Sequence, residues 1–166
     1  MMGNEVIQIK TRLGMFFSDI GEYEASEKML NEAMTLAEAK IDSNPELYCE
    51  AIFSLIKMTY IKIQKVVYST NPVYKEGYRL CKQLSPKCVE MHKKTYPPDS
   101  PKVIEALTCC GYFTSDYLYE AKKKCKKYGT FNQGLAEILM HIGRVKSQQG
   151  TGNDLAIAVP YFSKAM

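Results

Sequence analysis

The chain has 166 residues, of which 46% are hydrophobic and 24% are charged. This composition is typical of one folded domain of ordinary size and excludes a disordered or low-complexity chain. The net charge of +4 is too small to indicate nucleic-acid binding on its own. No apolar run approaches the roughly 18 residues that a membrane-spanning helix needs, and the first ten residues lack the pattern of a signal peptide.

The cysteines and histidines are not spaced as metal ligands. None of the six cysteines forms a Cys-x-x-Cys pair, and Cys109 and Cys110 are adjacent, which suits neither a disulfide nor a zinc site. The pattern predicts small buried thiols in a reducing compartment, so the expected location is the cytoplasm. His92 and His141 lie far apart and outside zinc-ligand spacing. We expect no metal and no cofactor.

Hydrophobic periodicity predicts an all-α chain whose helices are separated by short turns rich in Gly, Pro, Asn and Asp. The expected helices are about 4–20, 22–42, 46–68, 73–96, 102–117, 118–128, 131–149 and 154–166. Apolar residues in the first helix recur at spacings of three and four and share one face: Val6, Ile9, Leu13, Phe16, Phe17 and Ile20. Gly21 is expected to end that helix. Pro86 predicts either a kink or a restart of the fourth helix, with Ser85 as N-cap.

These helices group into helix-turn-helix units at about 4–42, 46–96, 101–128 and 131–166. The first unit carries Leu13-Gly14, Phe17, Gly21-Glu22-Tyr23, Leu30 and Ala33-Met34, with the small Ser26 between them. The last unit carries Ile142-Gly143, Gly150, Ala158, Phe162 and Ala165-Met166, with Thr151-Gly152-Asn153 as an insertion. Both patterns resemble the tetratricopeptide repeat, in which Ser26 takes the place of an alanine. The two middle units match more loosely.

The join between the middle units adds to this resemblance. Residues 88–103, which include Pro97-Pro98-Asp99-Ser100-Pro101, resemble the inter-repeat join of kinesin-light-chain-type repeats. The join is also similar to the helical C-terminal region of SET/MYND-type lysine methyltransferases, without their catalytic and zinc-binding parts. The resemblance implies a right-handed α-solenoid of antiparallel helix pairs over residues 1–166. The last helix has an apolar stripe, Ile157, Val159, Phe162 and Met166, and no capping helix follows it, so we expect a fragment of a longer array.

In tetratricopeptide repeats the first helix of each unit lines a concave groove that binds a peptide or a partner helix. The resemblance implies that these residues are exposed in that groove: Gln8, Thr11, Met15, Ser18, Ala51, Ser54, Met58, Glu105, Thr108, Tyr112, Ser115, Glu137, Met140, Arg144 and Ser147. Thr11 and Met15 stand where family members that grip acidic chaperone tails have Lys and Asn. The groove therefore favours a peptide with apolar anchors over an acidic tail.

The sequence contains one basic run and none of the common catalytic motifs. The run surrounds Cys125 and consists of Lys122, Lys123, Lys124, Lys126 and Lys127. It is more typical of a solvated helix face than of a phosphate-binding surface. We expect a non-catalytic scaffold or adaptor that binds a protein or peptide partner and no small-molecule substrate. The alternatives are a docking arm of a multidomain enzyme and a nucleic-acid-binding helical repeat, and the C-terminal apolar stripe could support self-association.

Overall fold

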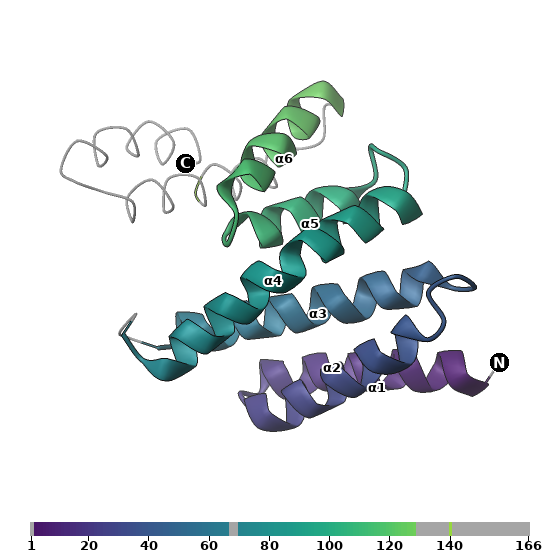
Figure 1. Ribbon diagram of the computed structural model, residues 1–166, viewed down its shortest axis with the longest axis vertical. Coiled ribbons are helices and arrows are strands. Elements are labelled where there is room, and N and C mark those ends of the chain that lie inside the picture. Colours follow the sequence, from purple (N-terminus) through teal and green to yellow (C-terminus); the bar gives the residue numbers. More distant parts are fainter. Residues whose placement is uncertain (1, 67–69, 129–139, 141–166) are drawn as a thin grey trace. The chain divides into compact units, whose positions relative to one another are not determined.

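A computed structural model describes residues 2–66, 70–128 and 140 of the chain, and these residues form helices and turns without a strand (Figure 1). The helices are α1 (Met2–Asp19), α2 (Tyr23–Glu38), α3 (Pro45–Gln64), α4 (Pro72–Thr95), α5 (Pro101–Gly111) and α6 (Ser115–Tyr128). The all-α prediction is therefore confirmed for the described part of the chain. The expected helices 131–149 and 154–166 lie outside it, apart from the helical Met140.

The chain divides into two compact units, Met1–Thr95 and Tyr96–Met166. The first unit contains α1 to α4, and the second contains α5 and α6 among its described residues. The boundary falls in the proline-rich join that the sequence places between its second and third helical pairs.

The two N-terminal helices approach closely because small residues stand at their contact. A side-chain carbon at Gly14 would come within 2.5 Å of Leu30 Cγ, so only glycine fits there without a shift of Leu30. The Ser26 hydroxyl donates a hydrogen bond of 2.6 Å to the Gly14 carbonyl oxygen. Gly21, with φ of 84°, makes the turn between α1 and α2, a conformation that side chains with a Cβ disfavour.

The third helix lies at the centre of the first unit, because it packs against α1, α2 and α4. Its Leu55 and Met58 are fully buried and form one hydrophobic cluster with Leu30 of α2. The half-buried Met15, Tyr23, Met34 and Leu84 pack around this cluster and come from α1, α2 and α4. The apolar run of α3 is thus the element against which the other helices of the unit are assembled.

The most regular apolar face of α1 is not part of this core. Val6, Ile9, Leu13, Phe16 and Ile20 do share a face, as their spacing predicts, but they are 42–56% exposed. The buried side of the helix consists of Ile7 and of the smaller residues Thr11, Gly14 and Ser18. Close packing against α2 selects small residues there, so hydrophobicity alone does not identify the buried side.

The fifth helix is shorter than its periodicity predicts. It ends at Gly111 and α6 begins at Ser115, whereas the sequence places this boundary near residue 117. Leu118 packs directly over Gly111, where a side chain would collide with it. The backbone N–H groups of Phe113 and Thr114 both donate to the Cys110 carbonyl and form a turn. The expected helix through residue 117 is therefore wrong.

Pro86 lies inside α4, which continues through it from Pro72 to Thr95. The alternative of a helix restart is wrong, and so is the N-cap role of Ser85. The buried Ser85 hydroxyl instead donates 2.6 Å to the Cys81 carbonyl one turn earlier. Proline has no N–H for the carbonyl four residues before it, so the helix tolerates one missing backbone hydrogen bond here.

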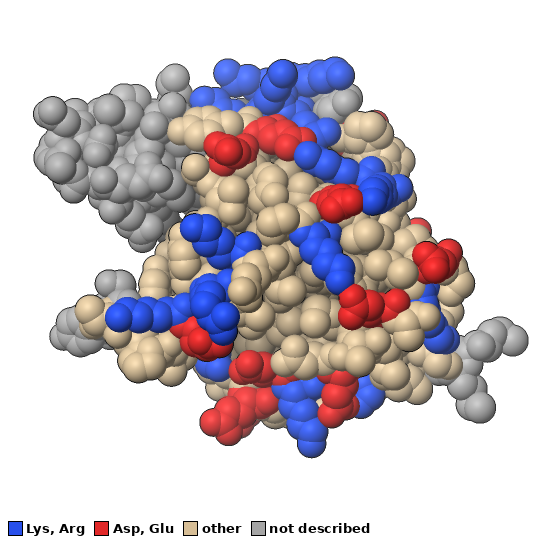
Figure 2. All heavy atoms as spheres, viewed as in Figure 1, with Lys and Arg blue, Asp and Glu red and all other residues tan. Residues whose placement is uncertain are grey.

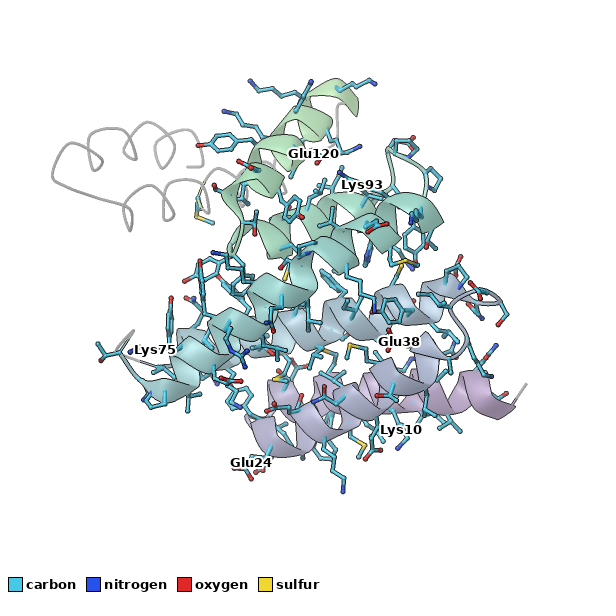
Figure 3. The ribbon with its side chains drawn as sticks, in the orientation of Figure 1. Lys10, Glu24, Glu38, Lys75, Lys93 and Glu120 are labelled. Carbon is cyan, nitrogen blue, oxygen red and sulfur yellow. The ribbon has the colours of Figure 1, made fainter. Side chains whose placement is uncertain are left out.

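Three ion pairs link α2 to the other helices of the first unit. Lys10 on α1 reaches Glu32 at 2.5 Å, and Lys62 on α3 reaches Glu27 at 3.0 Å. On α4, Lys87 lies 2.6 Å from Glu38, and its ammonium group is 5.1 Å from the centre of the Tyr48 ring. Figure 3 labels Lys10 on α1 and Glu38 on α2. The hydrogen bond from Lys87 to Glu38 is the largest cause of a raised Lys87 pKa, and the contact with Tyr48 raises it further.

Truncation of a core leucine should cost far more stability than truncation of an exposed one on the same helix. We expect Leu30→Ala to lower the free energy of unfolding by about 3 kcal/mol, because it leaves a cavity in the cluster with Leu55 and Met58. Leu36→Ala is the control, since Leu36 is 42% exposed, and it should change stability by about 0.5 kcal/mol or less. Urea titration followed by far-UV circular dichroism measures both. Equal losses would contradict this core assignment.

The pair between α1 and α2 gives a pH-dependent signature. The hydrogen bond from Lys10 lowers the pKa of Glu32 below its ordinary value of 4.5. The stabilising effect of this pair is therefore present above pH 4.5 and is lost as the pH falls through the folded-state pKa. We expect Lys10→Met to return the Glu32 pKa towards 4.5, as measured by NMR titration of the carboxyl carbon. Lys28→Met should have a smaller effect, because Lys28 acts on Glu32 only through its charge.

Candidate functional site

An open groove of about 390 Å³ lies between α1 and α3 in the first unit. It is lined by Thr11, Arg12, Met15, Phe16 and Asp19 from α1 and by Glu50, Phe53 and Ser54 from α3. The two helices pack against each other, so residues from both face the same groove. The groove thus brings together side chains that are about forty positions apart in the sequence.

The lining of this groove combines small buried groups, apolar groups and charges. Thr11 and Ser54 are only 8% and 9% exposed, so they form its deepest part. The Thr11 hydroxyl is already used, since it donates 2.9 Å to the Ile7 carbonyl of its own helix. Met15, Phe16 and Phe53 contribute apolar surface to the lining.

Charged residues of both signs stand at the exposed edge of the groove. Arg12, Asp19 and Glu50 are all exposed and line it. The Phe53 ring, which lines the groove, contacts the His92 ring of α4, whose centre lies 6.0 Å away in an edge-on arrangement. An apolar surface with polar edges is the usual composition of a binding site for a peptide side chain.

The sequence predicts part of this groove. Thr11, Met15 and Ser54 are among its expected concave residues, and the structure brings them together. Thr11 and Ser54 were expected to be exposed, and this is wrong, because both are buried. Gln8 is exposed on α1 but is not among the lining residues. Ser18, Met58 and Ala51 were expected to be exposed, and this is wrong: all three are buried, and Met58 belongs to the core.

Sequence reasoning missed five residues of the groove, namely Arg12, Phe16, Asp19, Glu50 and Phe53. Most of them are direct neighbours of residues that it did select. The available signal was helical geometry, because residues one turn apart on α1, such as Arg12 and Phe16, share a side of the helix. A repeat pattern predicts which residues of a helix face the groove at its centre. It does not predict how many of their neighbours also line the groove.

The expected residues of the later units do not join this groove. In the second compact unit, Glu105 is exposed, and the half-buried Thr108 donates its hydroxyl to the Ile104 carbonyl at 2.8 Å. Tyr112 was expected to be exposed on a helix, but it lies in the turn after α5 and is only 8% exposed. Ser115 begins α6. Of the last set, Met140 is exposed, while Glu137, Arg144 and Ser147 lie outside the described residues.

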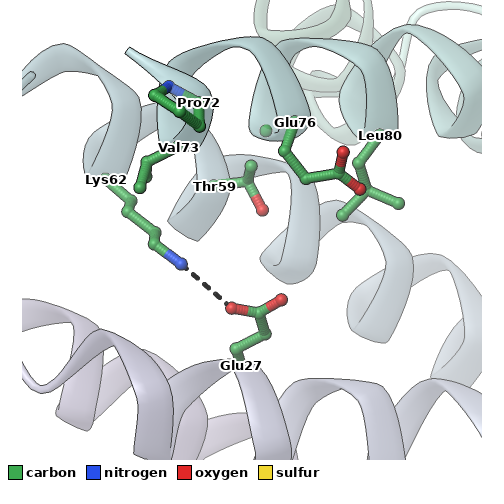
Figure 4. A pocket seen from close by; sticks show the side chains of 8 residues that line it. Glu27, Thr59, Lys62, Pro72, Val73, Glu76 and Leu80 are labelled. Carbon is green, nitrogen blue, oxygen red and sulfur yellow. Dashed lines mark hydrogen bonds and ion pairs between the residues drawn. The ribbon is translucent and has the colours of Figure 1, made fainter.

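A second pocket of about 340 Å³ lies among α2, α3 and α4 (Figure 4). Glu27 and Lys62 face each other across it and form the ion pair described above. Its other lining residues are Thr59, Pro72, Val73, Glu76, Gly77 and Leu80. Two of the charges that a ligand could use are therefore already bound to each other. This arrangement favours a bridge between helices over a ligand site.

The lysine run lies on α6, where Figure 2 shows a concentration of basic side chains at the top of the view. Lys123, Lys126 and Lys127 are exposed, whereas Lys122 and Lys124 are half-buried. Lys124 donates 3.1 Å to the Pro98 carbonyl of the preceding join. Cys125 is buried, as predicted. Glu120, labelled in Figure 3, and Asp116 lie on the same helix, so α6 is not uniformly basic.

The buried pair of Cys88 and His92 has the residue types of a nucleophile and its base, but not the geometry. The Cys88 sulfur lies 3.7 Å from His92 Nδ1, which is only 2.8 Å from the Cys88 carbonyl oxygen. A carbonyl oxygen can only accept, so Nδ1 carries the proton and donates it. It is then unable to take the proton of the thiol. The contact therefore fixes the imidazole one turn along α4 and does not activate the sulfur.

No cluster of three or more His, Cys, Asp or Glu side chains that could hold a metal ion occurs within the described residues. None of the helices described above is long and apolar enough to cross a membrane.

This geometry predicts an unreactive Cys88. We expect its alkylation by iodoacetamide in the folded protein to be at least tenfold slower than that of the half-buried Cys109, because Cys88 is fully buried and His92 does not deprotonate it. Mass spectrometry of quenched time points measures both rates in one sample, and a urea-unfolded sample shows that both thiols react once exposed. Faster labelling of Cys88 than of Cys109 would contradict the assigned proton position.

The chain matches no protein-family model, and comparison with curated proteins and with solved structures finds no similar protein.

Proposed function

We propose that the chain is a non-catalytic protein-interaction module that binds a peptide or a helix in the groove between α1 and α3. The observation that carries this proposal is the meeting of Thr11, Met15 and Ser54 in one groove. These residues were selected from a resemblance to tetratricopeptide repeats, in which the first helices of successive units line the binding surface. Their meeting supports a solenoid-like arrangement of the pairs α1–α2 and α3–α4.

The lining of the groove indicates the chemistry of its ligand. Met15, Phe16 and Phe53 provide an adaptable apolar surface that suits one or two apolar side chains of a partner. The edge carries one positive charge, on Arg12, and two negative charges, on Asp19 and Glu50. This balance favours a basic residue next to the apolar anchor and disfavours an acidic tail. The proposed ligand is therefore a short segment with an apolar anchor and a neighbouring Lys or Arg.

The packing behind the groove supports recognition by a pre-formed surface. The Phe53 ring contacts the His92 ring, and Met15 packs against the core cluster of Leu30, Leu55 and Met58. Side chains held in this way lose little conformational freedom when a ligand binds. The ordering cost of complex formation then falls mainly on the peptide. A rigid scaffold that presents an apolar groove is the mode of action that we assign to the first unit.

Peptide-library panning against the purified chain tests this proposal. We expect enrichment of sequences with an apolar anchor beside Lys or Arg, and we expect Met15→Ala to weaken binding of an enriched peptide by about tenfold, through loss of apolar contact. Fluorescence anisotropy with the labelled peptide measures both affinities. Met29→Ala is the matched control, because Met29 is half-buried on α2 and lines neither of the two pockets described above.

A charge variant identifies the edge of the groove independently. Glu50→Lys should weaken the binding of peptides that carry the basic residue, since Glu50 supplies negative charge on the α3 side. The affinity for peptides without that residue should stay unchanged. If the Met15 and Glu50 variants both bind the enriched peptides as tightly as the unchanged chain does, the binding surface lies elsewhere. That result would refute the groove as the peptide site. Failure to enrich any sequence would refute peptide binding as the function of this unit.

A further inference from the structure

The exposed face of α1 is a continuous apolar stripe. It consists of Val6, Ile9, Leu13, Phe16 and Ile20, whose exposed fractions are 42%, 56%, 42%, 55% and 56%. These five residues are the majority of the large hydrophobic side chains that are exposed in the described chain. A contiguous apolar patch on a protein surface often marks an interaction site, whereas single exposed apolar residues need no explanation.

The spacing of the stripe identifies the shape of its partner. Its positions alternate in steps of three and four residues, from Val6 through Ile9, Leu13 and Phe16 to Ile20. This is the average period of about 3.5 residues with which helices pair along a common seam. The opposite side of α1, with Thr11 and Gly14, is buried within the unit. The exposed seam therefore fits a helix laid along α1.

The charges beside the stripe favour a protein helix over a membrane surface. Glu5 and Asp19 are balanced by Lys10 and Arg12, and Lys10 is held by Glu32. A helix that binds an anionic bilayer needs an excess of basic residues on its polar side, which α1 lacks. Arg12 and Asp19 are exposed, and neither has an ion pair within the described residues. Both charges are available to a partner.

We propose that the stripe binds a second copy of the chain through antiparallel pairing of the two α1 helices. A two-fold axis between residues 14 and 15 places Ile9 against Ile20 of the second copy and Leu13 against Phe16 of the second copy. Each of these two residue pairs occurs twice in the dimer, as a two-fold interface requires. The same register brings Arg12 alongside Asp19 of the second copy at both ends of the seam. The stripe and its charges are thus complementary to themselves.

The charges also select the antiparallel direction. Parallel pairing would set Glu5 of one copy against Lys10 of the other, but Lys10 already makes the ion pair with Glu32. It would leave Arg12 facing the apolar Phe17 in a seam whose flanking positions normally carry charges. Antiparallel pairing keeps the Lys10–Glu32 pair and gives Arg12 an acidic partner. The antiparallel register therefore satisfies both the apolar stripe and the charges beside it.

Phe16 belongs to both surfaces, since it lies in the stripe and also lines the α1/α3 groove, and Arg12 and Asp19 beside the stripe line that groove too. The other stripe residues, Val6, Ile9, Leu13 and Ile20, do not line the groove. Substitution of Ile9 or Leu13 therefore probes dimerisation without touching the proposed peptide site. The two proposals can fail independently of each other.

Sedimentation velocity of the full chain, from about 1 to 100 μM, tests the dimer. We expect a concentration-dependent monomer–dimer equilibrium, and we expect Ile9→Glu and Leu13→Glu each to raise the dissociation constant at least tenfold, because each buries two charges in the seam. Gln8→Glu is the control, since Gln8 is exposed on the same helix but outside the stripe, and it should leave the constant unchanged. Far-UV circular dichroism confirms that each variant folds.

Charge exchange tests the register. Arg12→Asp should raise the dissociation constant several-fold by placing two acidic groups together, and the double variant Arg12→Asp with Asp19→Arg should restore it. A chain that stays monomeric at every concentration overturns the proposal, and so does a dimer that survives Ile9→Glu and Leu13→Glu. A double variant that fails to recover the dimer overturns the antiparallel register. Binding of the monomeric chain to anionic vesicles, lost in Ile9→Glu, would assign the stripe to a membrane surface instead.

Discussion

The first unit depends on the close contact between α1 and α2 at Gly14. Leu30 fills the space that a side chain at this position would occupy, and the Ser26 hydroxyl bonds to the Gly14 carbonyl. This contact brings Leu30 to the position where it meets Leu55 and Met58 of α3. The same approach turns the smaller residues of α1 inward and its larger residues outward. The groove and the apolar stripe both follow from this contact between α1 and α2.

The sequence predicts the helices well where they are bounded by strong turn signals. Gly21 lies in the turn between α1 and α2, and Pro45 and Pro72, each preceded by Asn, are the first residues of α3 and α4. Prediction fails where a boundary depends on tertiary contact, as at Gly111, where packing of Leu118 ends α5 before its periodicity does. It also fails at Pro86, because the buried surroundings of Ser85 and Cys88 stabilise a helix that proline alone disfavours.

The candidate site is predictable only in part, for a related reason. A repeat pattern selects Thr11, Met15 and Ser54 because it describes which side of a helix faces a neighbouring unit. It does not separate exposed positions from buried ones, since that distinction depends on the distance between neighbouring helices. Met58 shows this limit: Met58 and Ser54, one turn earlier, share a side of α3 and are both buried, but Ser54 lines the groove whereas Met58 belongs to the cluster with Leu30.

The double-sided character of α1 limits how the chain can vary over evolutionary time. One side of the helix needs small residues such as Gly14, and the adjoining side lines the groove with Arg12 and Met15. The remaining side carries the apolar stripe from Val6 to Ile20. Few positions of α1 are then left for neutral drift. If both surfaces are under selection, α1 should diverge more slowly among descendants of this gene than α2, where Glu24, Lys28 and Thr35 face solvent.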